Sequence, residues 1–213
     1  MTEREWEESE DPHAMLMRVE SESNRKLRLF ACACCHRIWS AIRDERCRAA
    51  VQGAEQFADG LISQVVFAEL SAAADEAYGE AFNSTRPGTE IVALYAAYFT
   101  AAENIEGWHI SDILRATADV SRTVSREVQA DLFREIFGNP FRETKFDKRW
   151  RTSDVMLLAD DIYTDRAFDR MPILADALQD AGCDSADVLN HLRDPSATHV
   201  RGCWALDLAL GNE

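Results

Sequence analysis

The sequence has few lysines. Only Lys26, Lys145 and Lys148 are lysines, so arginine supplies most of the 23 basic residues. Against 38 acidic residues they leave a formal net charge of −15. Nonspecific nucleic-acid binding needs a basic surface that neutralises phosphates, so we expect no direct contact with nucleic acid.

The sequence also lacks a long apolar run. A membrane-spanning helix needs about 20 consecutive apolar residues, and the most apolar stretches, 27–35 and 91–102, are shorter or interrupted. The N-terminus, MTEREWEESED, is acidic and has no apolar segment of the kind found in signal peptides. We therefore expect a cytoplasmic protein without membrane association, whose six cysteines are reduced unless they bind metal.

Strand signals are missing as well. Apolar residues repeat at helical spacing, and no alternating run or hairpin dipeptide between apolar strands interrupts them. This predicts a single all-α domain over 1–213 with about eight to ten helices. Its expected parts are an acidic lead-in (1–23), a helical core (24–137), an irregular connector (138–152) and a C-terminal helical clamp (153–213).

The most apolar helix is predicted over Arg25–Ile42. Within 27–35 Arg28 is the one residue that is not apolar, which indicates a buried helix. The surrounding segment 24–48 carries seven basic residues against two acidic ones. Two interpretations follow: the basic side chains dock on acidic neighbours within the fold, or Arg25, Arg28 and Arg37 form a strip that holds an acidic protein partner.

The C-terminal segment Asp169–Leu210 is divided by turn residues into three short helices, and the last of them is predicted from His199 to Leu210. The residues that set its turns are Pro172, Gly182, Pro195 and Gly211.

Cysteine and histidine recur at helical spacing in two segments. Cys32 lies one turn from Cys35 and His36, while His199 and Cys203 are four residues apart. If the two helices faced each other, these five side chains would offer the nitrogen and sulfur ligands of a tetrahedral zinc site. Cys183 and His191 are spare candidates. The alternative is that the cysteines pack in the core as small hydrophobic residues and His199 makes a hydrogen bond.

Two other motifs carry less weight. The run from Cys32 to His36 satisfies the c-type haem pattern, but attachment occurs outside the cytoplasm and the motif falls inside a buried helix. Glu106 and His109 form a single Glu-x-x-His, whereas di-iron bundles need two copies. We expect Glu103 and Glu106 on a solvated face, and Trp108 as a core anchor.

Three segments of the chain resemble a paralogous family of planctomycete bacteria of the Gemmata type. They are 28–39 (RLFACACCHRIW), 136–141 (IFGNPF) and 167–211, which contains MPILADALQDAGC and HVRGCW. The family shares an RLFACACC start, an IFGNPF bridge and an AFDRLPILADALEDAGC…HVRGCW ending; His36 departs from it, because arginine is expected there. The resemblance implies no activity, substrate or cofactor.

No nucleophile elbow, Walker loop or dinucleotide fingerprint occurs in the sequence. We therefore expect a non-enzymatic protein–protein interaction or regulatory module in the cytoplasm, with no cofactor other than zinc. The alternative function is a metal-binding (zinc) protein or a metal-dependent enzyme. Its site would lie between the CACCH helix and the HVRGC helix.

Overall fold

The computed structural model describes residues 1–19, 21, 23–142 and 144–212, and over these residues it confirms the all-α prediction. They form twelve α-helices and two short 3-10 turns, with no strand. The count exceeds the predicted eight to ten, and two of the helices lie in the acidic lead-in. None of the described helices combines the length and apolar character needed to cross a membrane.

The contacts of the chain fall into two compact units, unit 1 (Glu3–Phe133) and unit 2 (Arg134–Glu213), and the boundary lies inside α8. We describe each unit by itself, and the single-domain organisation stays a prediction. The helices of unit 1 are α1 (Glu3–Glu8), α2 (Pro12–Val19), α3 (Asn24–Arg37), α4 (Glu45–Ala58), α5 (Gln64–Phe82), α6 (Gly88–Thr100), α7 (Gly107–Val120) and the start of α8 (Arg126–Phe137).

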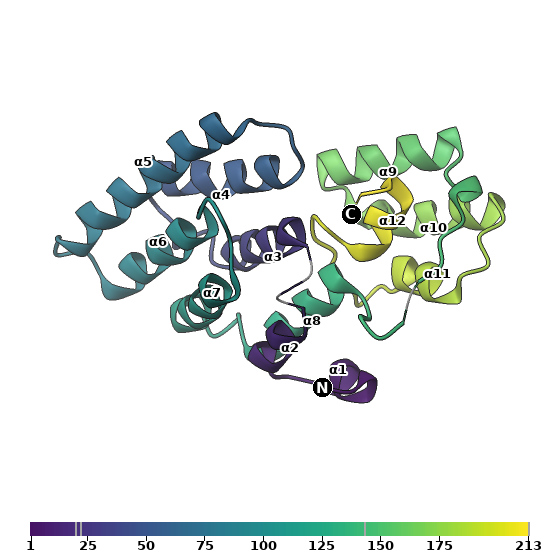
Figure 1. Cartoon of the computed structure of the whole chain (residues 1–213), viewed down its shortest axis with the longest axis horizontal. Coiled ribbons are helices and arrows are strands. Elements are labelled where there is room, and N and C mark those ends of the chain that lie inside the picture. Colours follow the sequence, from purple (N-terminus) through teal and green to yellow (C-terminus); the bar gives the residue numbers. More distant parts are fainter. Residues whose placement is uncertain (20, 22, 143, 213) are drawn as a thin grey trace. The chain divides into compact units, whose positions relative to one another are not determined.

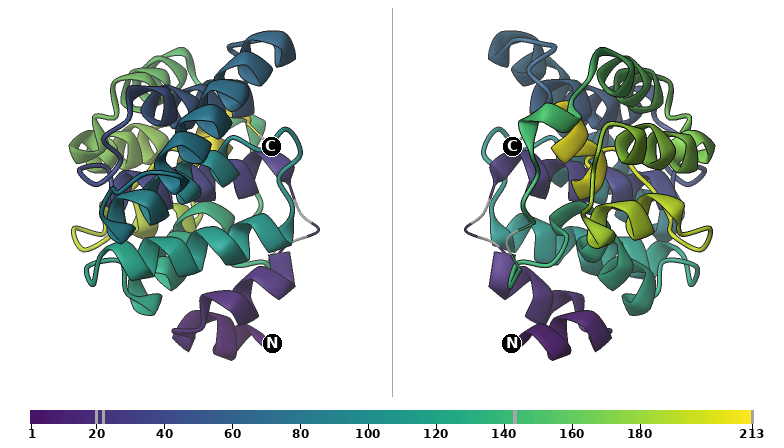
Figure 2. Two further views of the ribbon diagram at one scale, coloured as in Figure 1. Left: turned by 90° about the vertical axis from the view of Figure 1, so that its left-hand side faces the viewer. Right: turned by 90° about the vertical axis from the view of Figure 1, so that its right-hand side faces the viewer.

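Unit 1 is built from helix pairs. Figure 1 shows α4 beside α5, and α6 packs against α7; α2 lies against α7 (Figure 2, left). The N-cap residues of α3 and α4 are Ser23 and Asp44, and each side chain accepts a backbone N–H of the first helical turn. Side chains that are small or branched fill the core between α3, α4, α5 and α6.

Helix α3 ends at Arg37, so the predicted end at Ile42 is wrong. Ile38 donates its backbone N–H to the carbonyls of Cys35 and His36, and the chain continues in tight turns. Ile38 and Ile42 are nevertheless buried. The helical spacing of apolar residues therefore continues beyond the end of the helix, so the sequence pattern does not indicate where the helix ends.

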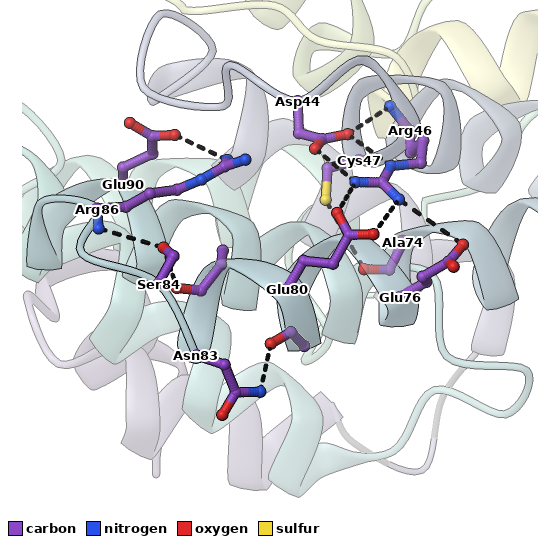
Figure 3. A network of polar contacts seen from close by, with 12 residues as sticks. Asp44, Arg46, Cys47, Ala74, Glu76, Glu80, Asn83, Ser84, Arg86 and Glu90 are labelled. Atoms are coloured by element: carbon purple, nitrogen blue, oxygen red, sulfur yellow. Dashed lines mark hydrogen bonds and ion pairs between the residues drawn. The ribbon is translucent and has the colours of Figure 1, made fainter.

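The basic side chains of segment 24–48 mostly find partners inside unit 1. Arg25 pairs with Asp59 at 3.0 Å, and both side chains are largely buried. Arg46 reaches Asp44 at 3.0 Å and Glu80 at 2.6 Å, and so links the start of α4 to α5 (Figure 3). These contacts favour internal docking over a basic strip that is free for a partner.

Arg28 is the most buried of these cations, with 1% of its surface exposed. Its guanidinium donates to the carbonyls of Ala102 at 2.7 Å and Glu103 at 2.9 Å, just beyond the end of α6. It also lies over the ring of Phe67 at 4.9 Å. Arg28 therefore donates to carbonyls and not to the carboxylates expected of internal docking, and Arg37 is exposed.

Unit 2 contains the segments predicted as the connector and the clamp, together with the end of α8. Between Phe137 and Ser153 the described residues form one 3-10 turn, η1 (Lys148–Trp150). The remaining elements are α9 (Ser153–Asp165), η2 (Phe168–Arg170), α10 (Met171–Asp180), α11 (Ala186–Arg193) and α12 (Trp204–Leu210). Helix α10 packs on α9 and α11, and α12 packs mainly on α9 (Figure 2, right).

The last helix begins later than predicted. It starts at Trp204, so His199 lies in the preceding loop and Cys203 takes the N-cap position. The reason is local: Gly202 has φ +88°, a left-handed conformation that no helix contains, and Cys203 closes a turn by donating its N–H to the carbonyl of Val200. Gly211 ends the helix in the same left-handed region, as predicted.

Candidate metal centre

Four side chains of unit 2 converge on one point. They are Glu135 of α8, His191 of α11, His199 of the following loop and Cys203 at the N-cap of α12. One carboxylate oxygen, two ring nitrogens and one sulfur all lie within 4.8 Å of one another. Glu135 and Cys203 are buried, and the histidine side chains are 18% and 7% exposed. Such a set of donor atoms, enclosed by protein, is a candidate metal centre.

The separations between these atoms are close to those of a tetrahedral site. His191 Nε2 lies 3.2 Å from Glu135 Oε2 and 3.3 Å from Cys203 Sγ. His199 Nδ1 lies 3.1 Å from Glu135 Oε1 and 4.0 Å from Cys203 Sγ. Zinc bonds of about 2.0–2.3 Å at tetrahedral angles place ligand atoms about 3.3–3.8 Å apart. The two histidines approach different oxygens of Glu135, so the binding of one ion requires the side chains to rearrange around it.

Local sequence signals hold the ligands in place. Glu135 lies in the last turn of α8, which ends at Gly138 with φ +65°. A Cβ atom at Gly138 would lie 3.1 Å from the ring of Trp204, so glycine permits this close approach. The ring of Trp204 in turn lies 5.0 Å from that of His191. The end of α8 and the start of α12 are thus packed together around the ligands.

The electrostatics favour a cation at this point. Burial raises the pKa of the Glu135 carboxyl, but hydrogen bonds with His191 and His199 outweigh burial and hold the pKa below its usual value. Glu135 therefore carries a negative charge inside the protein. Its Oε1 also accepts the backbone N–H of Val200 at 3.4 Å.

The thiol of Cys203, unlike the Glu135 carboxyl, is held in its neutral, protonated form. Burial and the nearby Glu135 carboxylate raise the pKa of the thiol well above its usual value. The backbone N–H groups of Leu206 and Ala205 interact with the sulfur and act in the opposite direction. A thiol in this environment keeps its proton until a metal ion displaces it, and the two N–H groups then stabilise the thiolate.

Of the five predicted ligands, the structure brings His199 and Cys203 together, although through a loop and not through the predicted helical spacing. His191 is one of the two spare candidates, and Cys183, the other, lies outside the group. Glu135 was missed. The one feature of the sequence that could have indicated Glu135 is its position in the last turn of a helix. There the helix dipole disfavours an acidic side chain that has no cationic partner.

The other three predicted ligands lie in unit 1 and have partners there. Cys32 Sγ donates to the carbonyl of Val51 at 3.6 Å, and His36 Nε2 lies 2.9 Å from Glu55 Oε1. Cys35 Sγ lies 3.2 Å from the hydroxyl of Thr100.

Burial raises the pKa of the Cys35 thiol to about 12, as it also raises that of Cys203, so the pKa does not distinguish the two cysteines as ligands. A zinc site that joins the CACCH and HVRGC segments stays a prediction.

Comparisons with known proteins add no relationship, since no protein-family model, no curated protein and no solved structure matches this chain.

Proposed function

We propose that this protein binds one zinc ion in unit 2, through Glu135, His191, His199 and Cys203, and that the ion has a structural role. The observation that carries the proposal is the convergence of four side chains of the kinds that zinc prefers, with one donor atom from each lying within 4.8 Å of the other three. A thiolate and two imidazoles select zinc over magnesium and calcium, which prefer oxygen ligands.

The arrangement favours a structural ion over a catalytic one. A catalytic zinc keeps one coordination position for water or substrate, whereas a structural zinc is enclosed by four protein ligands. Here four ligands are present, and the most exposed of them, His191, has 18% of its side-chain surface accessible. A bound ion would tie the end of α8 to the α11–α12 segment and so stabilise unit 2.

The wider role in this proposal is that of a non-enzymatic interaction or regulatory module in the cytoplasm. All six cysteines are free thiols, which supports a reducing compartment. The acidic-partner interpretation of the basic strip is weakened, because Arg25 and Arg28 already have partners within unit 1.

Metal analysis of two matched variants tests the zinc site. Cys203→Ser and Cys35→Ser make the same chemical change at two fully buried positions, one inside the proposed centre and one outside it. We expect about one zinc per chain in the wild-type protein and in Cys35→Ser, and a loss of about 90% or more in Cys203→Ser. Cobalt should give a thiolate-to-metal absorption band that disappears in the same variant.

Folded wild-type protein that takes up neither zinc nor cobalt would overturn the proposal. So would equal zinc content in the two cysteine variants. His191→Ala provides a second test at a ligand that is partly exposed, and it should also lose the metal.

A further inference from the structure

Six aromatic side chains form a continuous surface on unit 1, here called the aromatic surface. They come from α5, α6 and α7, and they are Tyr78, Phe82, Tyr95, Tyr98, Phe99 and Trp108. Neighbouring rings lie 4.4–6.0 Å apart between centroids, from Phe82 at one end to Trp108 at the other. Side chains from three helices therefore make one patch and not isolated contacts.

The two ends of the aromatic surface are the most exposed. Phe82 has 64% and Trp108 has 54% of its surface accessible. The expectation that Trp108 anchors the core is therefore wrong: its ring stacks on His109 at 3.5 Å and meets Phe99 at 5.5 Å, and more than half of its surface is exposed. Large exposed aromatic patches are uncommon on monomeric proteins, and tryptophan and tyrosine are enriched in interfaces.

Carboxylates border the rings. The Trp108 indole N–H donates to Glu106 at 2.8 Å, and the Tyr95 hydroxyl donates to Asp112 at 3.0 Å. Asp75 is exposed and follows the same helical face as Tyr78, three residues away on α5. Arg115 pairs with Asp112, which leaves the border with an excess of negative charge.

We propose that the aromatic surface binds an arginine-bearing segment of a partner protein. A guanidinium group stacks on aromatic faces and donates to carboxylates in the plane of the same group, so it matches both features of the surface at once. A lysine offers the charge without the planar stacking. The border carboxylates repel acidic segments and anionic lipid headgroups.

This interaction surface specifies the partner for the wider role proposed above, and it does not depend on the metal centre. Metal content measures one proposal and peptide binding measures the other, so either can fail alone.

The test uses full-length protein and a fluorescein-labelled peptide of four Arg-Gly-Ser repeats. Fluorescence anisotropy at two salt concentrations compares it with peptides in which lysine or glutamate replaces arginine. We expect saturable binding of the arginine peptide, weaker binding of the lysine peptide and none of the glutamate peptide. Phe82→Ala and Trp108→Ala should each weaken arginine-peptide binding about two- to fivefold.

Leu61→Ala is the matched control, since Leu61 is also in unit 1 and 65% exposed but lies outside the aromatic surface. It should leave the affinity unchanged. Circular dichroism establishes that each variant is folded, and Phe82→Ala keeps the test valid if Trp108→Ala disturbs α7.

Several results would overturn the proposal. One is the absence of saturable binding. Equal binding of the arginine and lysine peptides that neither aromatic variant affects is another, because diffuse charge would explain it. The glutamate peptide, or vesicles that contain phosphatidylserine, could also bind more tightly than the arginine peptide. Finally, sedimentation could show a dimer of the wild-type protein that is absent in Trp108→Ala, because a second copy of the chain would then cover the surface.

Discussion

The two cysteine–histidine segments have similar spacing but opposite outcomes. In α3 of unit 1, Cys32 and His36 face α4, where they meet Val51 and Glu55, and Cys35 turns toward α6. In unit 2, His199 and Cys203 belong to a loop and converge on shared neighbours. A regular helix that packs on several others directs its side chains to different elements. A loop with a left-handed glycine can bring them to one point.

Buried charge follows the same division. In unit 1 the most buried cation, Arg28, is satisfied by carbonyls near the end of α6. In unit 2 one buried carboxylate gathers two histidines and borders a thiol. Distributed contacts stabilise a fold, whereas a concentrated group of donors can also bind a ligand. The predictions below test this contrast.

The largest effect should come from zinc itself. At a free zinc concentration 1,000 times the dissociation constant, binding should stabilise the folded state by about 4 kcal/mol. Hydrogen exchange should locate the gain in α11 and α12 of unit 2. The Cys203→Ser variant serves as the control and should gain almost nothing. An equal gain in that variant would show that zinc acts elsewhere.

The buried cation of unit 1 should rank next. Arg28→Met removes the guanidinium and leaves the carbonyls of Ala102 and Glu103 without their donor, so the free energy of unfolding should fall by roughly 3 kcal/mol. Arg37→Met, at an exposed position of the same helix, should change it by less than about 0.5 kcal/mol. Urea denaturation measures both, and equal effects would contradict the distinction between them.

Two glycine variants should differ in sign. Gly202→Ala forces a side chain into φ +88° and should cost about 1–2 kcal/mol, and it should weaken zinc binding through the displaced Cys203. Gly79→Ala replaces a helical glycine of α5 that has no neighbour within 4 Å of an added Cβ. It should stabilise unit 1 by about 0.5–1 kcal/mol. Thermal unfolding and zinc titration would reveal any reversal.

The smallest effect concerns the charge of Asp44, which caps α4. Hydrogen bonding with Arg46 holds the pKa of Asp44 below its ordinary value of 3.8. The charged form therefore stabilises the fold above pH 3.8, and this contribution is lost as the pH falls through the lower folded-state pKa.

Asp44→Ala should cost about 1 kcal/mol at neutral pH. Asp44→Asn keeps a cap acceptor and should cost less. The difference between Asp44→Asn and the wild-type protein should shrink at low pH, and denaturation curves at several pH values measure it. A difference that is constant with pH would show that charge plays no part.

The sequence by itself determined the helical fold and many of its boundaries. Helical spacing, the caps Ser23 and Asp44, and Gly211 are local signals, and their energetic preferences act within one or two turns of the chain. They led to the all-α prediction and the clamp. They also brought His199 and Cys203 to attention, because the two are only four residues apart.

Tertiary structure alone decided what surrounds these residues. Glu135 lies 56 positions before His191 in the chain, so no local pattern links their charges. Trp108 lies outside the core, with 54% of its surface exposed, which its hydrophobic character alone does not indicate. The proposed metal centre and the aromatic surface thus depend on contacts between elements that are distant in the sequence. These elements meet only when the chain has folded, so local sequence patterns do not reveal the contacts.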